Sequence, residues 1–123
     1  MKRAVRWAIL YAVVIIGLSS VPGKNFPETA WLAHDKVIHF GEYGLFSFLV
    51  AKAMNTRVTA SGRIFLITLL LAGLFGMLDE LYQSIIPGRD SSVNDWIADV
   101  AGVLLGSCVY LWLKYRRDQT TVH

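Results

Sequence analysis

Charged residues are scarce in this sequence of 123 residues, where they make up 17% of the chain, against about 25% in average soluble proteins. Hydrophobic residues make up 54%, and the mean hydropathy is +0.47. This composition excludes a disordered chain, and so few charges could hardly coat the surface of an ordinary soluble domain. The net charge is only +3, and the basic residues lie between apolar blocks. A nucleic-acid-binding module with a wide basic face is therefore excluded.

Cysteine is almost absent as well. Cys108 is the only one, and it lies inside an apolar run. The chain therefore has neither a disulfide framework nor the clustered cysteines of a zinc module. A chain of this length has room for one domain, and no internal repeat divides it, so we treat residues 1–123 as a single domain.

Long apolar runs, in contrast, are abundant. Each is close to the roughly 20 residues that a membrane-spanning helix needs. We predict an all-α fold, a polytopic membrane bundle of four transmembrane helices. The alternative is a soluble bundle, which four helices that are apolar all round disfavour. The runs cover about residues 4–21, 37–54, 64–86 and 95–113.

The first apolar run has a second interpretation. Lys2, Arg3 and Arg6 precede it, and Gly17-Leu18-Ser19 has the small-x-small pattern of a signal-peptide cleavage site. We favour an uncleaved helix, because the charge-free stretch is long for a signal peptide. In both cases the chain emerges outside the membrane after this run.

The basic residues indicate the orientation of the bundle. Since lysine and arginine favour the cytoplasmic side, we predict a multi-pass protein of the cytoplasmic (inner) membrane with both termini in the cytoplasm. Three basic residues lie in the two connections predicted outside: Lys24, Lys36 and Arg89. Nine lie in the segments predicted inside: Lys2, Arg3, Arg6, Lys52, Arg57, Arg63, Lys114, Arg116 and Arg117.

Acidic residues are concentrated near the outer ends of three predicted helices. Seven of the nine lie between Asp35 and Asp99, and the predicted orientation places all seven on the outer side. A charge that faces lipid near the helix centre costs at least about 2.5 kcal/mol, so intramembrane ionisable residues face the bundle interior and mark function. We predict that one outward-facing polar pocket is lined by His39, Glu42, Asp79, Glu80, Gln83, Asp95 and Asp99.

Other residues near the acids complete this picture. Pro87-Gly88 ends the third run and turns the chain. Arg89 follows as the strong cation closest to the acids, and its guanidinium can bind a carboxylate or phosphate through two parallel hydrogen bonds. Carboxylates this close cannot all stay ionised unless His39, Arg89, protons or a divalent cation neutralise them.

Three motifs, each on its own apolar run, resemble the VanZ-like family of small bacterial membrane proteins. They are Asp35-Lys36-x-x-His39-Phe40-x-x-Tyr43, Asp79-Glu80-x-x-Gln83-x-x-x-Pro87-Gly88-Arg89, and Asp95-x-x-x-Asp99-x-x-Gly102-x-x-x-Gly106. Asp99 departs from the family, which usually carries Asn there. The resemblance implies a protein of the bacterial cell envelope. The name-giving member of the family is associated with low-level resistance to the glycopeptide teicoplanin.

Three functions remain open at this point. The favoured one is a site that binds or modifies an anionic lipid-linked precursor or another envelope component. The second is a membrane-embedded hydrolase or transferase, and the third is a small transporter, which is disfavoured because the inner half lacks acids. The candidate catalytic residues are His39, Glu42, Asp79 and Glu80. The candidate substrate-binding residues are Asp35, Tyr43, Gln83, Arg89, Asp95 and Asp99. The candidate ligands of a divalent cation are Asp79, Glu80 and Asp99.

Several of these residues also have a purely structural interpretation. Tyr43 fits a core aromatic residue, and Asp95 fits the capping position of its helix. His39 is spaced to pair with Asp35 or Glu42. The glycines in the third motif fit close helix contact in lipid.

Overall fold

The computed structural model describes the backbone of residues 2–25 and 28–122 and the side chains of residues 2–24 and 35–122. These residues form four α-helices and no strand: α1 (Arg3–Ser19), α2 (Glu28–Met54), α3 (Ser61–Gln83) and α4 (Val93–Thr120). A short 3-10 helix, η1 (Gly23–Asn25), follows α1. The predicted all-α fold is confirmed.

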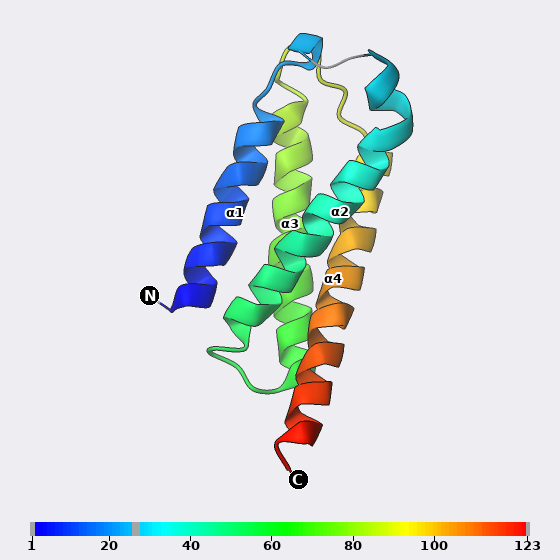
Figure 1. Cartoon of the computed structure of the whole chain (residues 1–123). Helices are drawn as coiled ribbons and strands as arrows, with labels where there is room; N and C mark the ends of the chain where they lie inside the picture. Colours follow the sequence, from blue (N-terminus) through cyan, green and yellow to red (C-terminus); the bar gives the residue numbers. More distant parts are fainter. Residues whose placement is uncertain (1, 26–27, 123) are drawn as a thin grey trace.

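The helices run alternately up and down, so that the connections alternate between two ends of the bundle (Figure 1). The end that we call the terminal end holds both chain termini and the connection from α2 to α3 (Figure 1). The opposite end, the loop end, holds η1 and the connection from α3 to α4. There the Gly23 N–H donates to the Pro87 carbonyl oxygen at 3.1 Å. Gly88 next to it has a φ of 74°, which glycine adopts without strain.

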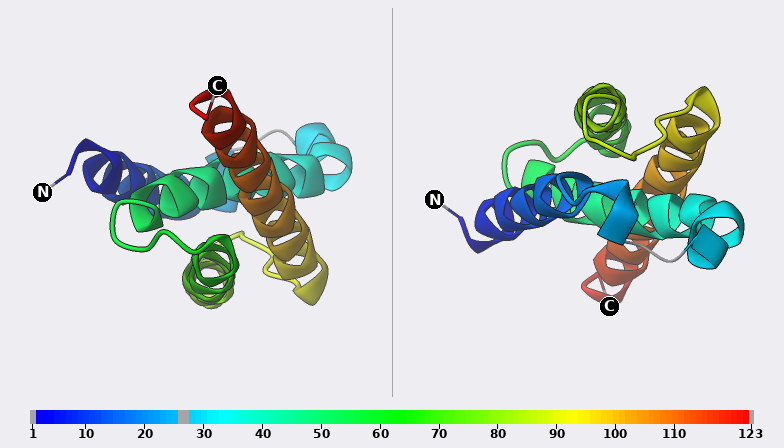
Figure 2. Two further views of the ribbon diagram at one scale, coloured as in Figure 1. Left: turned by 90° about the horizontal axis from the view of Figure 1, so that it is seen from below. Right: turned by 90° about the horizontal axis from the view of Figure 1, so that it is seen from above.

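The closest helix pair is α2 with α4, which cross each other in the end-on views (Figure 2). Glycine makes this approach possible. A Cβ atom on Gly102 would overlap the carbonyl oxygen of Phe40, and one on Gly106 would overlap that of Gly44. The small residues of α4 therefore lie in a helix–helix contact, as small residues do in membrane bundles.

The outer surface of the bundle is largely apolar, whereas its interior contains polar as well as apolar side chains. The outward side of α3 carries Leu66, Leu70, Leu74 and Leu78, each more than half exposed. The buried side of the same helix carries Ile64, Thr68, Ala72, Gly76, Asp79, Glu80 and Gln83. Hydrocarbon surroundings would cover the exposed leucines, whereas water would leave a large apolar surface uncovered. This distribution indicates a membrane protein.

Two of the helices are long and apolar enough to cross a membrane, namely α3 and α4. At 1.5 Å per residue, α3 is about 34 Å long and exceeds the roughly 30 Å of a hydrocarbon core. Helix α1 has only 17 residues, and charged residues interrupt the apolar run of α2. Length and composition alone therefore do not identify α1 and α2 as membrane spans. The four-span topology therefore stays a prediction.

The helix ends differ from the predicted apolar runs. The structure begins α2 at Glu28 rather than at residue 37, and extends α4 to Thr120 rather than to residue 113. An apolar run marks the part of a helix that lies in lipid, but polar residues such as Glu, Lys, Arg and Gln continue a helix beyond it. Conversely, α3 ends at Gln83 rather than at residue 86, because Pro87 disfavours helix in the residue before it.

Candidate functional site

Buried polar side chains gather in the half of the bundle nearest the loop end. They come from α2, α3 and α4, which are separate in the sequence and meet only in the folded bundle. We call this set the polar cluster, and its members are Asp35, His39, Glu42, Tyr43, Asp79, Glu80, Gln83, Asp95 and Asp99. All of them are buried except Asp35 and Glu42, which are partly exposed.

His39 lies at the centre of the polar cluster, where it faces one carboxyl group from each of three helices. Its Nδ1 atom is 2.8 Å from Oδ1 of Asp99 on α4, a hydrogen bond, and 3.4 Å from Oε1 of Glu80 on α3. Its Nε2 atom is 3.5 Å from Oδ1 of Asp35, one turn earlier on α2. The exposed fractions are 4% for His39, 6% for Glu80 and 0% for Asp99. The imidazole is thus enclosed among acids.

Asp79 belongs to a second group of contacts beside the first. The Tyr43 hydroxyl donates to Oδ2 of Asp79 at 2.9 Å, and Nε2 of Gln83 donates to the same oxygen at 3.2 Å. Gln83 also donates to Oγ of Ser19 at 3.1 Å, which ties α1 to the cluster. These neutral donors hold the Asp79 carboxyl group toward α2 and α1.

Gly76 lets the two groups come close together. A Cβ atom at this position would lie 3.2 Å from Cε1 of Tyr43 and 3.4 Å from Oδ2 of Asp99. The contact with Tyr43 is tighter than most Cβ contacts, so a side chain here would require the tyrosine ring to shift by a few tenths of an ångström. The contact with Asp99 is ordinary van der Waals packing, so glycine at this position chiefly makes room for Tyr43.

Asp95 has partners that account for it as a capping residue. The Asp95 backbone N–H donates to Oγ of Ser92, the N-cap of α4, and the Ser92 hydroxyl donates to Oδ2 of Asp95 at 2.7 Å. Lys36 donates to its other oxygen at 3.1 Å. These contacts satisfy the first turn of α4 and favour an acid near its positive end. A substrate-binding role for Asp95 stays a prediction.

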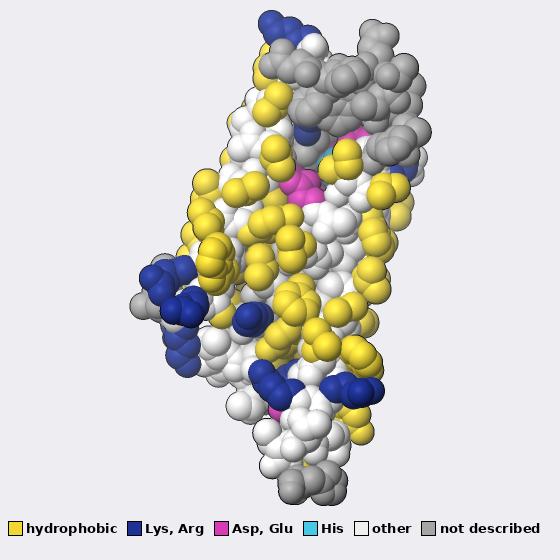
Figure 3. Space-filling view, in the orientation of Figure 1, with side chains coloured by type: hydrophobic (Ala, Val, Ile, Leu, Met, Phe, Trp, Pro, Cys, Tyr) yellow, Lys and Arg dark blue, Asp and Glu magenta, His cyan; other side chains and the backbone are white. Residues whose placement is uncertain are grey.

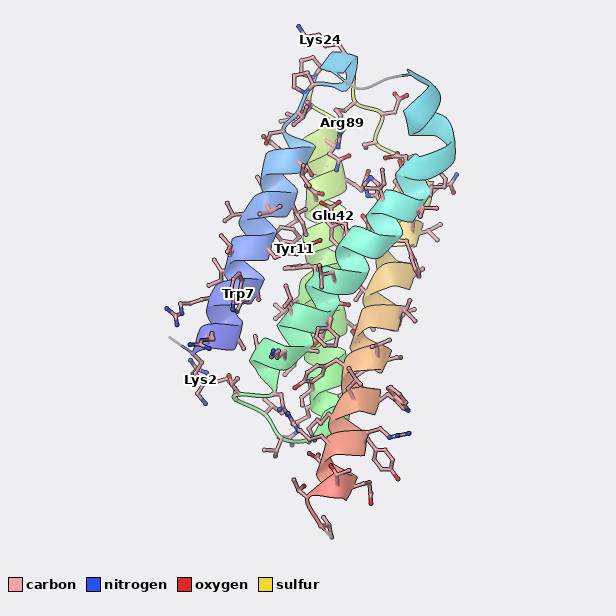
Figure 4. The ribbon with its side chains drawn as sticks, viewed as in Figure 1. Lys2, Trp7, Tyr11, Lys24, Glu42 and Arg89 are labelled. Atoms are coloured by element: carbon pink, nitrogen blue, oxygen red, sulfur yellow. The ribbon has the colours of Figure 1, made fainter. Side chains whose placement is uncertain are left out.

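Arg89 and Glu42 lie on the face of the bundle that includes α1. In Figure 4, Arg89 is at the loop end, Glu42 lies below it and Tyr11 lies below Glu42. Arg89 interacts electrostatically with the carboxyl groups of Glu42 and Asp35. Asp35 precedes the apolar run of α2, and burial raises the pKa of its carboxyl group above the ordinary value, while the nearby His39 ring acts in the opposite direction. The guanidinium thus lies at the loop end, close enough to interact with two acids of the polar cluster.

Several carboxylate oxygens of the polar cluster are buried without a hydrogen bond of standard geometry to the described residues. Such a group costs about 1–3 kcal/mol, and more when it is charged. Three buried carboxyl groups and the partly exposed Glu42 against one imidazole also leave an excess of negative charge that protons or a cation must balance. The oxygens are Oε1 of Glu42, Oδ1 of Asp79, both oxygens of Glu80 and Oδ2 of Asp99.

Comparison with known proteins bears on the whole chain. A protein-family model described as VanZ/LLP1 matches residues 6–114. The chain belongs to the VanZ/LLP1 family. The matched range contains the entire polar cluster, and together with the two apolar helices it indicates a membrane protein of the VanZ/LLP1 type. No curated protein and no solved structure matches the chain.

The structure of this VanZ/LLP1 domain groups the predicted metal candidates differently from the prediction. Ligand atoms of His39, Glu80 and Asp99 all lie within 4.8 Å of one another. Asp79, which we predicted beside Glu80 and Asp99, faces Tyr43 and Gln83 instead. The reason is that Asp79 and Glu80 are adjacent on α3, so their side chains leave the helix about 100° apart.

Sequence analysis missed three residues that contact the cluster. Lys36 was counted only as a basic residue and as part of a motif, although it pairs with Asp95. Ser92 was not predicted near the cluster, although its hydroxyl donates to the Asp95 carboxyl group. Ser19 was considered only within a cleavage pattern, although it is 3% exposed and accepts from Gln83. For Ser19, the available signal was its position as a polar residue at the end of an apolar helix.

Proposed function

We propose that the polar cluster is an outward-facing site that binds the anionic headgroup of a lipid-linked or other envelope component. The observation that carries this proposal is the convergence of three helices' ionisable side chains around His39, with buried oxygens left unsatisfied. Ionisable groups inside a membrane protein are costly and mark ligand or ion sites. A purely structural cluster would be expected to satisfy its own oxygens.

The proposal includes a topology in which all four helices span the membrane and both termini are cytoplasmic. On the face shown in Figure 3, most of the basic side chains lie over the terminal half of the molecule, and nine of the twelve lie in segments at that end. The positive-inside rule then puts the terminal end in the cytoplasm and the cluster outside. The outward apolar residues of α1, such as Ile9, Val13 and Ile16, are suited to lipid contact.

The mouth of the site has the charge that an anionic headgroup needs. Arg89 offers a planar fork for a phosphate or carboxylate, and Lys36 is exposed beside Asp95. The acids lie deeper than these cations and would repel an anion unless protons or a metal ion neutralise them. We therefore assign headgroup binding to Arg89 and Lys36, while the acids lie deeper in the bundle than these two side chains.

An apolar groove toward the terminal half supports a lipid ligand. It is bounded by α1, α2 and α3 and has a volume of about 280 Å³. Tyr11 stacks on Phe46, which is one of the groove residues, and Tyr11 also interacts with Glu42. A lipid whose hydrocarbon chain bound in this groove would therefore have its headgroup close to the polar cluster.

A second candidate function is enzymatic. The 2.8 Å bond between His39 and Asp99 is the arrangement in which a carboxylate orients a histidine as general acid or base. Among the described residues no serine is paired with this histidine, since Ser84 donates to a backbone carbonyl and Ser92 to Asp95. A hydrolysis or transfer reaction here would therefore use an activated water, a substrate hydroxyl group or a carboxylate of the cluster as nucleophile rather than a serine.

Teicoplanin susceptibility tests the function in cells. We expect the wild-type chain, expressed in a teicoplanin-sensitive bacterial host, to raise the inhibitory concentration of teicoplanin. The Arg89→Lys variant keeps the charge but loses the planar fork, so it should lose most of this effect. The matched control is Arg63→Lys at the terminal end, which should behave as wild type. Equal protection by Arg89→Lys and wild type would remove the role proposed for Arg89.

A further inference from the structure

We propose that His39, Glu80 and Asp99 bind a divalent first-row transition-metal ion, for which Zn²⁺ is the best probe. Each of the three residues comes from a different helix, and their ligand atoms lie within 4.8 Å of one another. One imidazole nitrogen with two carboxylates is a ligand set that zinc accepts and that Mg²⁺ and Ca²⁺, which prefer oxygen alone, do not favour.

The distances are close to those of a metal site. Zinc–nitrogen and zinc–oxygen bonds of about 2.1 Å in a tetrahedron put neighbouring ligand atoms about 3.4 Å apart. Nδ1 of His39 and Oε1 of Glu80 are 3.4 Å apart already. Nδ1 and Oδ1 of Asp99 are 2.8 Å apart, so metal binding requires this hydrogen bond to open by about 0.6 Å. Rotation of the Asp99 carboxyl group, whose Oδ2 is unpartnered, would achieve this.

The unsatisfied oxygens point to a missing positive ligand at this spot. Both oxygens of Glu80 and Oδ2 of Asp99 are buried without a hydrogen bond of standard geometry, and both residues are more than nine-tenths buried. The nearest groups to the Glu80 carboxyl group are the His39 ring at 3.4 Å and the Ser92 backbone N–H, which interacts with it. A divalent ion bound by two carboxylates and a neutral imidazole has no net charge. Such a set removes the cost of isolated buried carboxylates, which a neutral hydrogen-bond donor would not do.

Asp35 has the position of the residue that orients a metal-bound histidine. Metal-ligating histidines commonly donate their other ring N–H to a carboxylate, which fixes the tautomer. Nε2 of His39 is 3.5 Å from Oδ1 of Asp35. With the proton held on Nε2, the Nδ1 lone pair is directed at Glu80 and Asp99. Asp35 is thus a positioning residue, not a ligand.

The ion would also complete the function proposed above, and to that extent the inference rests on it. Three protein ligands leave a fourth position for water or an oxygen of a ligand, as in zinc sites that are not purely structural. A phosphate or carboxylate of a headgroup held by Arg89 would have such an oxygen. The metal would then convert an acidic cluster into one that attracts an anion.

Metal binding can be tested without any headgroup ligand. The full-length chain is purified, stripped with a chelator and placed in nanodiscs of neutral phosphatidylcholine. Zinc per chain is then measured by elemental mass spectrometry, and affinity by competition with a chromogenic chelator. We expect one zinc ion per chain. Glu80→Gln, which keeps the side-chain shape, should bind zinc at least about tenfold more weakly, whereas Asp90→Asn, an exposed acid at the same end, should bind as wild type.

A spectroscopic measurement keeps the test decisive if a variant folds poorly. Zinc K-edge absorption of the wild type should show one imidazole among nitrogen and oxygen ligands. Asp35→Asn should weaken binding by about tenfold while the imidazole signature remains. Wild-type protein without bound zinc, or equal zinc affinity in Glu80→Gln, would overturn the site. Absence of zinc together with headgroup binding after chelation would refute the metal site while the proposed function stands. Zinc binding without headgroup binding would leave the metal site and refute the proposed function.

Discussion

Replacement of Tyr43 by phenylalanine tests whether the polar cluster is held together as the structure describes. Tyr43 is 0% exposed, and its hydroxyl donates to Oδ2 of Asp79 at 2.9 Å. Tyr43→Phe removes this donor and keeps the ring, which packs edge-on against Phe46 at 6.1 Å. Asp79 would retain only the longer bond from Gln83, at 3.2 Å, while its Oδ1 has no partner already.

The size of the effect follows from the acceptor. Hydrogen bonds between helices of membrane proteins average about 0.6 kcal/mol, with a maximum of about 1.7 kcal/mol. Hydrogen bonds to charged groups contribute about 1.5–3 kcal/mol. Because the acceptor is a buried carboxyl group, we expect Tyr43→Phe to lower the free energy of unfolding by about 1.5 kcal/mol. Oδ2 of Asp79 keeps the bond from Gln83, so the figure is for the lost hydrogen bond alone.

Unfolding by SDS in mixed micelles provides the assay. The matched control is Tyr110→Phe, because Tyr110 is also buried and packs edge-on against Phe48, and no hydrogen bond of its hydroxyl occurs within the described residues. We expect the control to stay within about 0.5 kcal/mol of wild type, because it keeps the buried ring and removes no hydrogen bond. A double-mutant cycle with Asp79→Leu, which has no acceptor, should recover most of the Tyr43 effect as coupling. Equal stability of Tyr43→Phe and wild type would refute the bond.

Three further predictions address the topology, the packing and the mouth of the site. After replacement of Cys108, a cysteine at Ser91 should react with an impermeant thiol reagent from outside and one at Thr59 should not; the opposite pattern would place the cluster on the cytoplasmic side. Gly102→Ala should destabilise the protein by about 1–3 kcal/mol in SDS unfolding, because its Cβ atom would overlap the Phe40 carbonyl oxygen. The control Gly73→Ala should not destabilise the protein, because nothing lies within 4 Å of its Cβ atom. Equal stability of the two variants would contradict the α2–α4 contact. Retention of an anionic lipid by purified protein should fall in Arg89→Lys relative to Arg57→Lys, and equal lipid content would leave Arg89 as a loop charge.

The fold class and the depth of the polar residues could be predicted from the sequence because both depend on simple regularities. The apolar runs predicted the number of helices, and their opposite directions predicted that Asp79 and Asp99 lie at similar depth. The helix ends at Glu28 and Thr120 could not be predicted in this way, since helix continues where hydropathy falls. Hydropathy reports contact with lipid, not hydrogen bonding along the backbone.

The pairing within the cluster depends on helix rotation and side-chain rotamers, which periodicity does not determine. The sequence predicted Asp79 as a metal candidate, yet Tyr43 and Gln83 hold its carboxyl group elsewhere. His39, in contrast, was predicted in the pocket as an acid or base and lies between Glu80 and Asp99. Ser19 was missed because α1 has no polar stripe that would indicate which side faces the cluster. Its contact with Gln83 arises only when α1 packs against the bundle.

Native mass spectrometry of the protein released from nanodiscs tests the central claim most directly. Nanodiscs are formed from native membranes, so that the chain can carry a bound envelope lipid with it. We predict that wild-type protein retains one anionic lipid-linked species, and that His39→Gln loses it while Arg63→Lys, at the terminal end, keeps it. A wild-type spectrum with only the bulk membrane lipids, or the same bound species in all three proteins, would contradict a binding site centred on His39.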